Sequence, residues 1–381
     1  SNSGDILLNT GTTSIDIANA SSTITVGFVS GDAVVPASVS DIKFVSDKFT
    51  SNGALVFHTS GKLVIEPFSQ SFNADFNTTG LTYAADLSGL TIGKSGNTSA
   101  ITVGSPTTIA GPVTVYGGAV AINAGVISTG TVTLTGTTIT DGASGYITAD
   151  KLALIGGAVT LDHTSNSINT LAASGVSNLT YVNAGALTIG TVNPSGITAT
   201  GDVRIETLSG DLTIAQDVST ASTTANAVLI NAGKNTAAGT SSGGDILING
   251  TRSITAGTGG IIRLMSGSVS GSTGLSTLVG AGSGNFRYNS DESATGYSWT
   301  LRPDVVNAIY REQPTATANI DSYAVTYGFD HTQTLNNLKP DGVSALSTVR
   351  VARNGDENVS GLGVIIQGAT YSTAGKLNYA A

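Results

Sequence analysis

The chain has 381 residues, a formal net charge of −9, 11% charged residues, 49 glycines, three histidines and no cysteine. Without cysteine, disulfides, thiolate nucleophiles and zinc fingers are excluded, and so few histidines disfavour a histidine metal site or general base. The acidic balance argues against nucleic acid as a partner. No apolar run exceeds five residues, so we expect no membrane insertion.

Short stretches of alternating apolar residues recur along the chain, each closed by a turn rich in Gly, Asn, Asp or Ser. A period of two is typical of strands with one buried face, and no segment longer than a turn keeps a helical period. In chain order, the clearest examples are GDILLN (4–9), STITVG (22–27), GPVTVYGGAVAINAG (111–125), GTVTLTGTTITDG (130–142), KLALIGGAVTLDH (151–163), GALTIG (185–190), GDVRIE (201–206), GDLTIA (210–215) and GDILING (244–250).

The strand starts recur at a nearly constant interval. Val113, Val132 and Leu152 follow one another at spacings of 19 and 20 residues. Coils of about 20 residues with glycine corners predict an all-β parallel solenoid, with apolar residues inside and their polar neighbours facing water. A longer repeat, 80–103 against 178–200, supports this interpretation. The residues that we expect to point inward are Ile92, Val115, Leu134, Leu154, Ile189, Val203 and Ile248.

Two segments depart from this pattern. Residues 28–76 hold seven of the nine phenylalanines but still alternate, which predicts bulkier coils of the same solenoid. From Trp299 onward the charge density nearly doubles. We therefore predict a solenoid over residues 1–298 and a small β-sandwich-like domain over 299–381, either complete or cut short at Ala381.

The expected end of the solenoid needs a cap, because a terminal coil exposes an unpaired strand edge. Residues 286–301 carry aromatic side chains for this role, and we expect Trp299 to pack against the last coil. Residues 302–318 are predicted to lead out to the next domain. The predicted cap aromatics are Phe286, Tyr288, Tyr297 and Trp299, and the predicted edge charges are Arg287, Asp291 and Glu292.

Three stretches, at 90–125, 151–192 and 209–218, resemble large secreted bacterial exoproteins of the filamentous-haemagglutinin type, the passengers of two-partner secretion. The resemblance implies a right-handed parallel β-helix on the bacterial cell surface, exported through an outer-membrane partner. It also implies adhesion to glycans or proteins of host or neighbouring cells. YREQPTATANIDSYAVTYGFD (310–330) resembles the sandwich repeats that often follow. Neither the family's secretion domain nor a signal peptide is seen, so we expect a piece of a longer protein.

Parallel β-helices can also be polysaccharide lyases or hydrolases, which need clustered carboxylates or a basic residue beside calcium. The aspartates here are spread along the sequence, and Asp202, Asp211 and Asp245 each follow a glycine at a strand start. We predict that they are turn residues bonded to their own backbone. The densest charged group, Asp202 with Arg204 and Glu206, is predicted to lie on a solvated outer face as a surface ion pair.

Other candidate sites are weaker. The nonapeptide of calcium-binding solenoids does not occur, so no metal is expected. We expect His58 to be exposed and His163 to be a turn residue. A Thr-x-Thr ladder for ice binding starts at residues 131–135 but is not kept in the next coil, where Lys151, Ala153 and Ile155 take the alternate positions. Glycosylation sequons occur at Asn19, Asn77, Asn97, Asn178, Asn249 and Asn358.

Together these observations favour a non-catalytic stalk and adhesion module, with no catalytic, cofactor-binding or metal-ligating residue assigned. The alternative is a carbohydrate-binding or carbohydrate-degrading β-helix. Two or three carboxylates gathered in one groove would favour hydrolysis, whereas carboxylates scattered over flat faces would favour a stalk.

Overall fold

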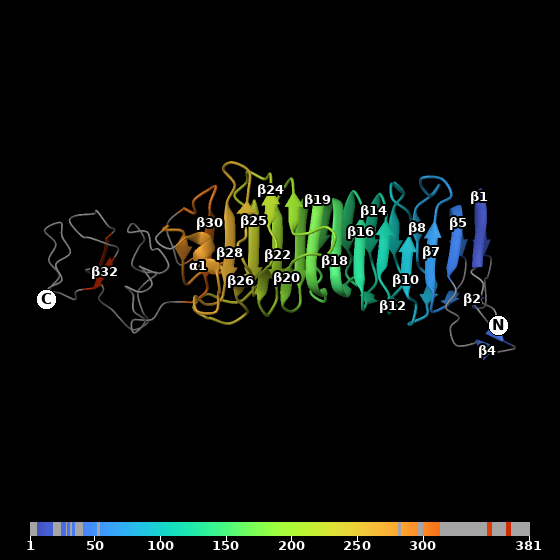
Figure 1. The fold of residues 1–381 in the computed structure, drawn as a ribbon, viewed down its shortest axis with the longest axis horizontal. Helices are drawn as coiled ribbons and strands as arrows, with labels where there is room; N and C mark the ends of the chain where they lie inside the picture. The colour runs from blue at the N-terminus through green and yellow to red at the C-terminus, as the bar shows by residue number, and fades with distance from the viewer. Residues whose placement is uncertain are drawn as a thin grey trace. The chain divides into compact units, whose positions relative to one another are not determined.

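The computed structural model describes residues 6–17, 24–27, 29–30, 33–34, 41–51, 54–280, 283–295, 300–312, 349–352 and 363–366. The protein is all-β, and its parallel strands form a β-solenoid, as predicted (Figure 1). The one helix among the described residues is α1 (Leu275–Val279). The chain divides into two compact units, Ser1–Thr200 and Gly201–Ala381.

Unit 1 consists of short strands that pair in parallel from coil to coil, apart from the antiparallel pair β3–β4. Its strands are β1 (Ile6–Ile17), β2 (Ile24–Gly27), β3 (Val29–Ser30), β4 (Ala33–Val34), β5 (Ile42–Ser51), β6 (Leu55–His58), β7 (Lys62–Glu66), β8 (Phe76–Asn77), β9 (Leu81–Tyr83), β10 (Gly89–Ile92), β11 (Ile101–Val103), β12 (Thr107–Ile109), β13 (Val113–Tyr116), β14 (Ala119–Ile122), β15 (Val126–Ser128), β16 (Thr131–Thr135), β17 (Thr138–Asp141), β18 (Ile147–Leu161), β19 (Ser167–Asn183), β20 (Leu187–Ile189) and β21 (Ile197–Ala199).

The strand register confirms the predicted coil length in the middle of unit 1. Val113 pairs with Val132, Val132 with Leu152, and Leu152 with Leu171. Because the interval is close to constant, apolar residues stack on apolar residues at every step and form continuous interior ladders. Leu134, in the centre of this region, is fully buried.

Six of the seven residues predicted to point inward are buried, and the seventh is half-buried. Ile248 on β26 (Ile246–Ile248) is the exception. It borders an open surface pocket of about 390 Å³ that Gly274 and Leu278 also line, so one side of its side chain is not covered. The six buried residues are Ile92, Val115, Leu134, Leu154, Ile189 and Val203.

The phenylalanine-rich coils belong to the same solenoid, as predicted. Phe44 contacts Phe49 and Phe57 edge-on, with ring centroids 5.6 Å apart in each pair. Phe72 stacks on Phe76 at 5.3 Å. These rings fill coils that are longer than those in the middle of the unit, since Leu63 pairs with Leu90.

Unit 2 continues the parallel coil pattern with longer connections. Val203 pairs with Val228, Val228 with Ile262, and Ile262 with Val306, so the interval grows from 25 to 34 to 44 residues. Besides β26 and α1, its elements are β22 (Val203–Thr207), β23 (Leu212–Ile214), β24 (Val218–Thr220), β25 (Val228–Ala232), β27 (Ile254–Thr255), β28 (Ile262–Ser266), β29 (Phe286–Arg287), β30 (Val306–Tyr310), β31 (Val349–Ala352) and β32 (Gly363–Ile366).

The domain boundary predicted at residue 298 stays a prediction, although coil pairing continues past that residue. β30 pairs in parallel with β28, so coil pairing extends to Tyr310, inside the segment expected to be a junction. β31 and β32 form an antiparallel pair. Most of the predicted sandwich-like domain lies outside the described residues.

The predicted cap is partly confirmed. β29 pairs with β30 on the edge opposite β28. Phe286 and Tyr288 are buried and stack on Tyr310, with ring centroids 6.4 and 5.4 Å away. Tyr297 and Trp299 lie outside the described residues.

Candidate functional site

The outer face of unit 2 carries buried apolar residues where β13 and β16 of unit 1 carry threonines at most outward positions. In β25 and β28, Leu229 and Met265 alternate with the interior residues and therefore point away from the core. Both are nonetheless buried, together with Ile309 of β30, and Leu301 packs against the three of them. The connection between β29 and β30 thus covers the outer face of the coils beneath it.

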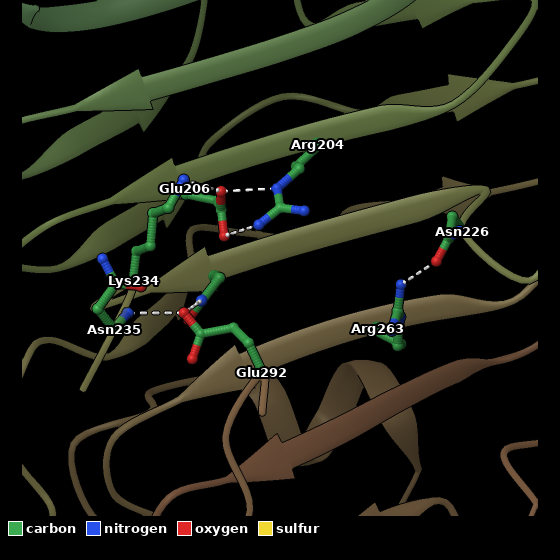
Figure 2. Close-up of polar contacts among 8 residues, drawn as sticks. Arg204, Glu206, Asn226, Lys234, Asn235, Arg263 and Glu292 are labelled. Carbon is green, nitrogen blue, oxygen red and sulfur yellow. Dashed lines mark hydrogen bonds and ion pairs between the residues drawn. The ribbon is translucent and has the colours of Figure 1, made fainter. Parts of the chain in front are cut away.

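Beside this apolar cluster lies the charged group that the sequence singled out (Figure 2). Glu206 of β22 is fully buried, which contradicts its predicted place on a solvated face. Its carboxylate accepts two hydrogen bonds from Arg204, at 2.7 and 3.0 Å, and its Oε2 lies 2.9 Å from the Nζ of Lys234. Glu206 does point outward, but the connection that follows β25 brings Lys234 over it.

Burial disfavours the ionised form of Glu206, yet the hydrogen bonds and charges of Arg204 and Lys234 outweigh it. The pKa of Glu206 is therefore lowered from its ordinary value of 4.5. Side-chain exposure is 45% for Arg204 and 25% for Lys234, so both cations keep contact with water. A carboxylate held ionised by two cations cannot act as a general acid near neutral pH, and the group is suited to fastening the connection to the coil.

A second set of contacts fastens the connection between β29 and β30. Glu292 accepts hydrogen bonds from the Nδ2 of Asn231, at 2.9 Å, and the backbone N–H of Asn235, at 2.7 Å (Figure 2). Asp291 accepts a bond from the backbone N–H of Ala238 at 2.8 Å. Although burial raises the pKa of Asp291, its hydrogen bonds from Ala238 and from residues 293–294 lower it overall.

Two arginines of this region are buried, which contradicts the edge role predicted for Arg287. Arg287 donates to the carbonyls of Gly284 and Phe286, both at 2.8 Å. Arg311 donates from Nη2 to the carbonyls of Ser242 and Gly244, at 2.9 and 2.8 Å. Burial lowers the pKa of Arg311, although nearby carboxylates partly offset this effect. Both guanidinium groups serve to satisfy carbonyls of the long connections.

The aspartates at the strand starts are corner residues, as predicted, but their partners lie in the neighbouring coil. Asp211 accepts the backbone N–H of Asp245 at 2.9 Å, and Asp245 accepts that of Ser268 at 2.6 Å. Asp202 accepts the hydroxyls of Ser222 and Thr224. Each carboxylate thus joins two coils. Within the described residues, no group of three or more His, Cys, Asp or Glu could hold a metal ion.

The remaining predictions have mixed outcomes. His163 adjoins a turn and accepts the backbone N–H of Ser165 on Nδ1, as expected. His58 is half-buried, not exposed. The predicted interruption of the threonine ladder is confirmed, since residues 131, 133 and 135 pair with 151, 153 and 155. The Asn97 sequon is buried and its amide bonds to the carbonyl of Tyr116, whereas the sequons at 19 and 358 lie outside the described residues.

The structure also contains a groove that the sequence analysis missed. It has a volume of about 580 Å³ and crosses the corners that follow β10, β13, β16 and the first part of β18 in unit 1. Its principal side chains are Asn97, Tyr116, Thr135 and Ile155. One feature of the sequence could have predicted the groove. Glycine recurs at 117–118, 136 and 156–157, one coil apart, and corners without side chains leave a hollow on the outer surface.

Comparisons with known proteins gave no match: no family model, curated protein or solved structure is similar to this chain. Over the part of the chain that the structure describes, no helix has the length and apolar character needed to cross a membrane.

Proposed function

We propose that this chain is a non-catalytic stalk and adhesion module of a large extracellular bacterial surface protein of the filamentous-haemagglutinin type. Export through an outer-membrane secretion partner belongs to the same proposal. Its partners are glycans or proteins on host or neighbouring cells. The resemblance at 90–125, 151–192 and 209–218 motivates this assignment, and the parallel solenoid is compatible with it.

The proposal that the chain is non-catalytic rests on the hydrogen bonds and ion pairs that its carboxylates make. Asp202, Asp211 and Asp245 each accept a hydrogen bond from the next coil, and Glu206 is paired with two cations. Glycoside hydrolysis instead requires two carboxyl groups facing one scissile bond, one of them able to give up a proton. The described carboxylates are therefore suited to holding the coils together.

The physical design suits a structure that works outside the cell. Burial of apolar side chains in the interior ladders stabilises the fold by about 25 cal/mol for each Å² of apolar surface. The hydrogen bonds between coils pair the backbone N–H and C=O groups. Stability of this kind does not depend on a redox environment or on metal supply, both of which vary outside the cell. The acidic net charge favours solubility and does not attract polyanions.

The test is adhesion of beads coated with the full chain to epithelial cells and to bacterial cells, with the same samples assayed for breakdown of a polysaccharide panel. We expect saturable adhesion that the soluble chain inhibits, and no new reducing or unsaturated ends. Pretreating the cells with glycosidases or proteases separates glycan from protein receptors. Adhesion equal to that of albumin-coated beads would contradict the adhesive role, and polysaccharide breakdown would contradict the non-catalytic one.

The second candidate function is carbohydrate binding without catalysis. The groove of unit 1 favours it, because the groove is concave, open and lined by an aromatic ring and hydroxyl groups.

A further inference from the structure

The groove of unit 1 runs across successive coils. Apart from Asp75 and Ala100 at one end, its lining comes from residues 96–98, 116–119, 135–137 and 155–156, which are the same corner in four consecutive coils. Coils stack about 4.8 Å apart, so the groove extends for roughly 15 Å in the stacking direction. A ligand that fills it is therefore elongated and lies across the strands.

The backbone at the floor of the groove is already paired. The N–H of Gly117 donates to the carbonyl of Thr135 at 3.0 Å, and the N–H of Gly136 donates to the carbonyl of Ile155 at 3.1 Å. A peptide that binds as an added strand needs unpaired N–H groups as well as unpaired carbonyls, and the N–H groups of these two glycines are already used. Recognition therefore depends on side chains.

Those side chains combine apolar surface with hydroxyl groups. Tyr116 and Ile155 are half-buried and line the groove with Thr135 between them in register. The Oγ1 of Thr135 is shielded from water and has no hydrogen-bond partner among the described residues. Because that hydroxyl makes no bond within the described protein, turning it toward a ligand breaks none, and a ligand that pairs with it removes an unfavourable buried polar group.

The charge of the groove restricts the ligand further. Asp75 is the one charged side chain among the lining residues, and its Oδ1 already accepts the backbone N–H of Ala100 at 3.1 Å. No cation lines the groove, so a sulfated or uronic acid polymer would meet only repulsion there. The chemistry that fits is neutral, rich in hydroxyl groups and apolar on its ring faces.

We propose that this groove binds a neutral oligosaccharide laid along the stacking direction, with Tyr116 stacked on one sugar ring and the Thr135 hydroxyl bonded to the glycan. One sugar unit of an extended glycan is close in length to one coil spacing, so consecutive sugars meet consecutive corners. This inference rests on the proposed adhesive function and names the chemistry of its receptor.

The experiment is calorimetric titration of the full chain with neutral homo-oligosaccharides, from disaccharides to hexasaccharides of glucose, galactose, mannose, N-acetylglucosamine and N-acetylgalactosamine. We expect at least one series to bind, with affinity rising to about the tetrasaccharide and then levelling off. Tyr116→Ala should weaken binding about tenfold or more, whereas Tyr116→Phe keeps the ring and most of the affinity.

Thr135→Val and Thr133→Val form a matched pair for the hydroxyl. Both residues lie on the half-exposed face of β16, but only Thr135 lines the groove. We expect Thr135→Val to weaken binding several-fold without loss of thermal stability, and Thr133→Val to leave binding unchanged.

Absence of binding across the whole panel would overturn the inference, as would equal affinity of wild type and Tyr116→Ala. Bead adhesion separates the two proposals. If Tyr116→Ala beads adhere like wild type, the groove is not the receptor site of the adhesin, while the adhesive function stands. If wild-type beads do not adhere but a tetrasaccharide binds at Tyr116, the adhesive function fails and the groove remains a carbohydrate site.

Discussion

The central coils of unit 1 and the coils of unit 2 use one interior pattern to make different outer surfaces. In unit 1 the interval between stacked positions is 19 or 20 residues, as between Val113, Val132 and Leu152. In unit 2 it grows to 44 residues between Ile262 and Val306. The interior ladders are alike in both, so the added residues change what covers the strands, not how the strands pair.

Coverage changes the chemistry of the outer face. At outward positions of unit 1, such as Thr133, the side chain is half-exposed and polar. At outward positions of unit 2, Leu229 and Met265 are buried beneath a connection that ion pairs and buried arginines fasten. The most conspicuous charged group of the chain is therefore suited to stability, and the groove that we propose for recognition lies in the plainer coils of unit 1.

The largest effect is expected where a charge enters the interior. Leu134→Asp would bury an unpaired carboxylate in a fully buried position, and we expect a loss of about 4 kcal/mol or more in the free energy of unfolding. Thr133→Asp, one residue earlier on the outward side, should cost less than about 1 kcal/mol. Denaturant unfolding followed by circular dichroism measures both. Equal free energies of unfolding for wild type and Leu134→Asp would show that the inward register is wrong.

The sequence predicts what depends on local periodicity. Alternation in β13, β16 and β18 and the 19- to 20-residue interval were sufficient to identify the coils, their register and their interior. Periodicity also gives the outward direction of Glu206 correctly. It cannot give the burial of Glu206, because the covering residue Lys234 follows a different strand and the apolar cover comes from residues far along the chain.

The sequence nevertheless contained an indication that the outer faces of β25 and β28 are buried. VLINA in β25 is a nearly continuous apolar run, and IRLMS in β28 has the adjacent apolar residues Leu264 and Met265, unlike the alternating VTVY of β13. Continuous runs indicate strands buried on both faces. The groove was missed for another reason, since it arises from glycine corners that become neighbours only when the coils stack.

A smaller effect is expected where the cover of unit 2 meets the coils. Met265→Ala removes an outward side chain that packs with Leu229 and Ile309, and we expect a loss of about 2–3 kcal/mol. Thr133→Ala, the corresponding change on an uncovered face, should cost less than about 0.5 kcal/mol. Hydrogen exchange in the full chain should show reduced protection in β28 and β30 for Met265→Ala. A loss as small as that of Thr133→Ala would mean that the cover contributes little to stability.

The smallest loss in the free energy of unfolding is expected when ion pairs are broken, and one pair from each unit can be compared. Glu206→Gln keeps the shape of the side chain but leaves Arg204 and Lys234 without their carboxylate. Because both cations reach water, we expect a loss of about 1–2 kcal/mol, below that of a fully buried pair. Glu66→Gln breaks the partly exposed pair with Lys43, in which Nζ and Oε1 are 2.8 Å apart, and should cost less than about 0.5 kcal/mol. Equal losses for the two variants would show that burial adds nothing to the Glu206 network.

The pH dependence of stability tests the contribution of Glu206 independently. The folded pKa of Glu206 is lowered from 4.5, so the stability it contributes is complete above about pH 4.5 and is lost as the pH falls through the lowered value. Hydrogen exchange of β22 and β25 should therefore lose protection on acidification below that point. Glu206→Gln should begin less protected and show a shallower decline, with a remainder due to Asp291, whose pKa is also lowered. Parallel pH profiles in wild type and variant would contradict this, because they would mean that Glu206 binds its proton equally well in the folded and unfolded chain.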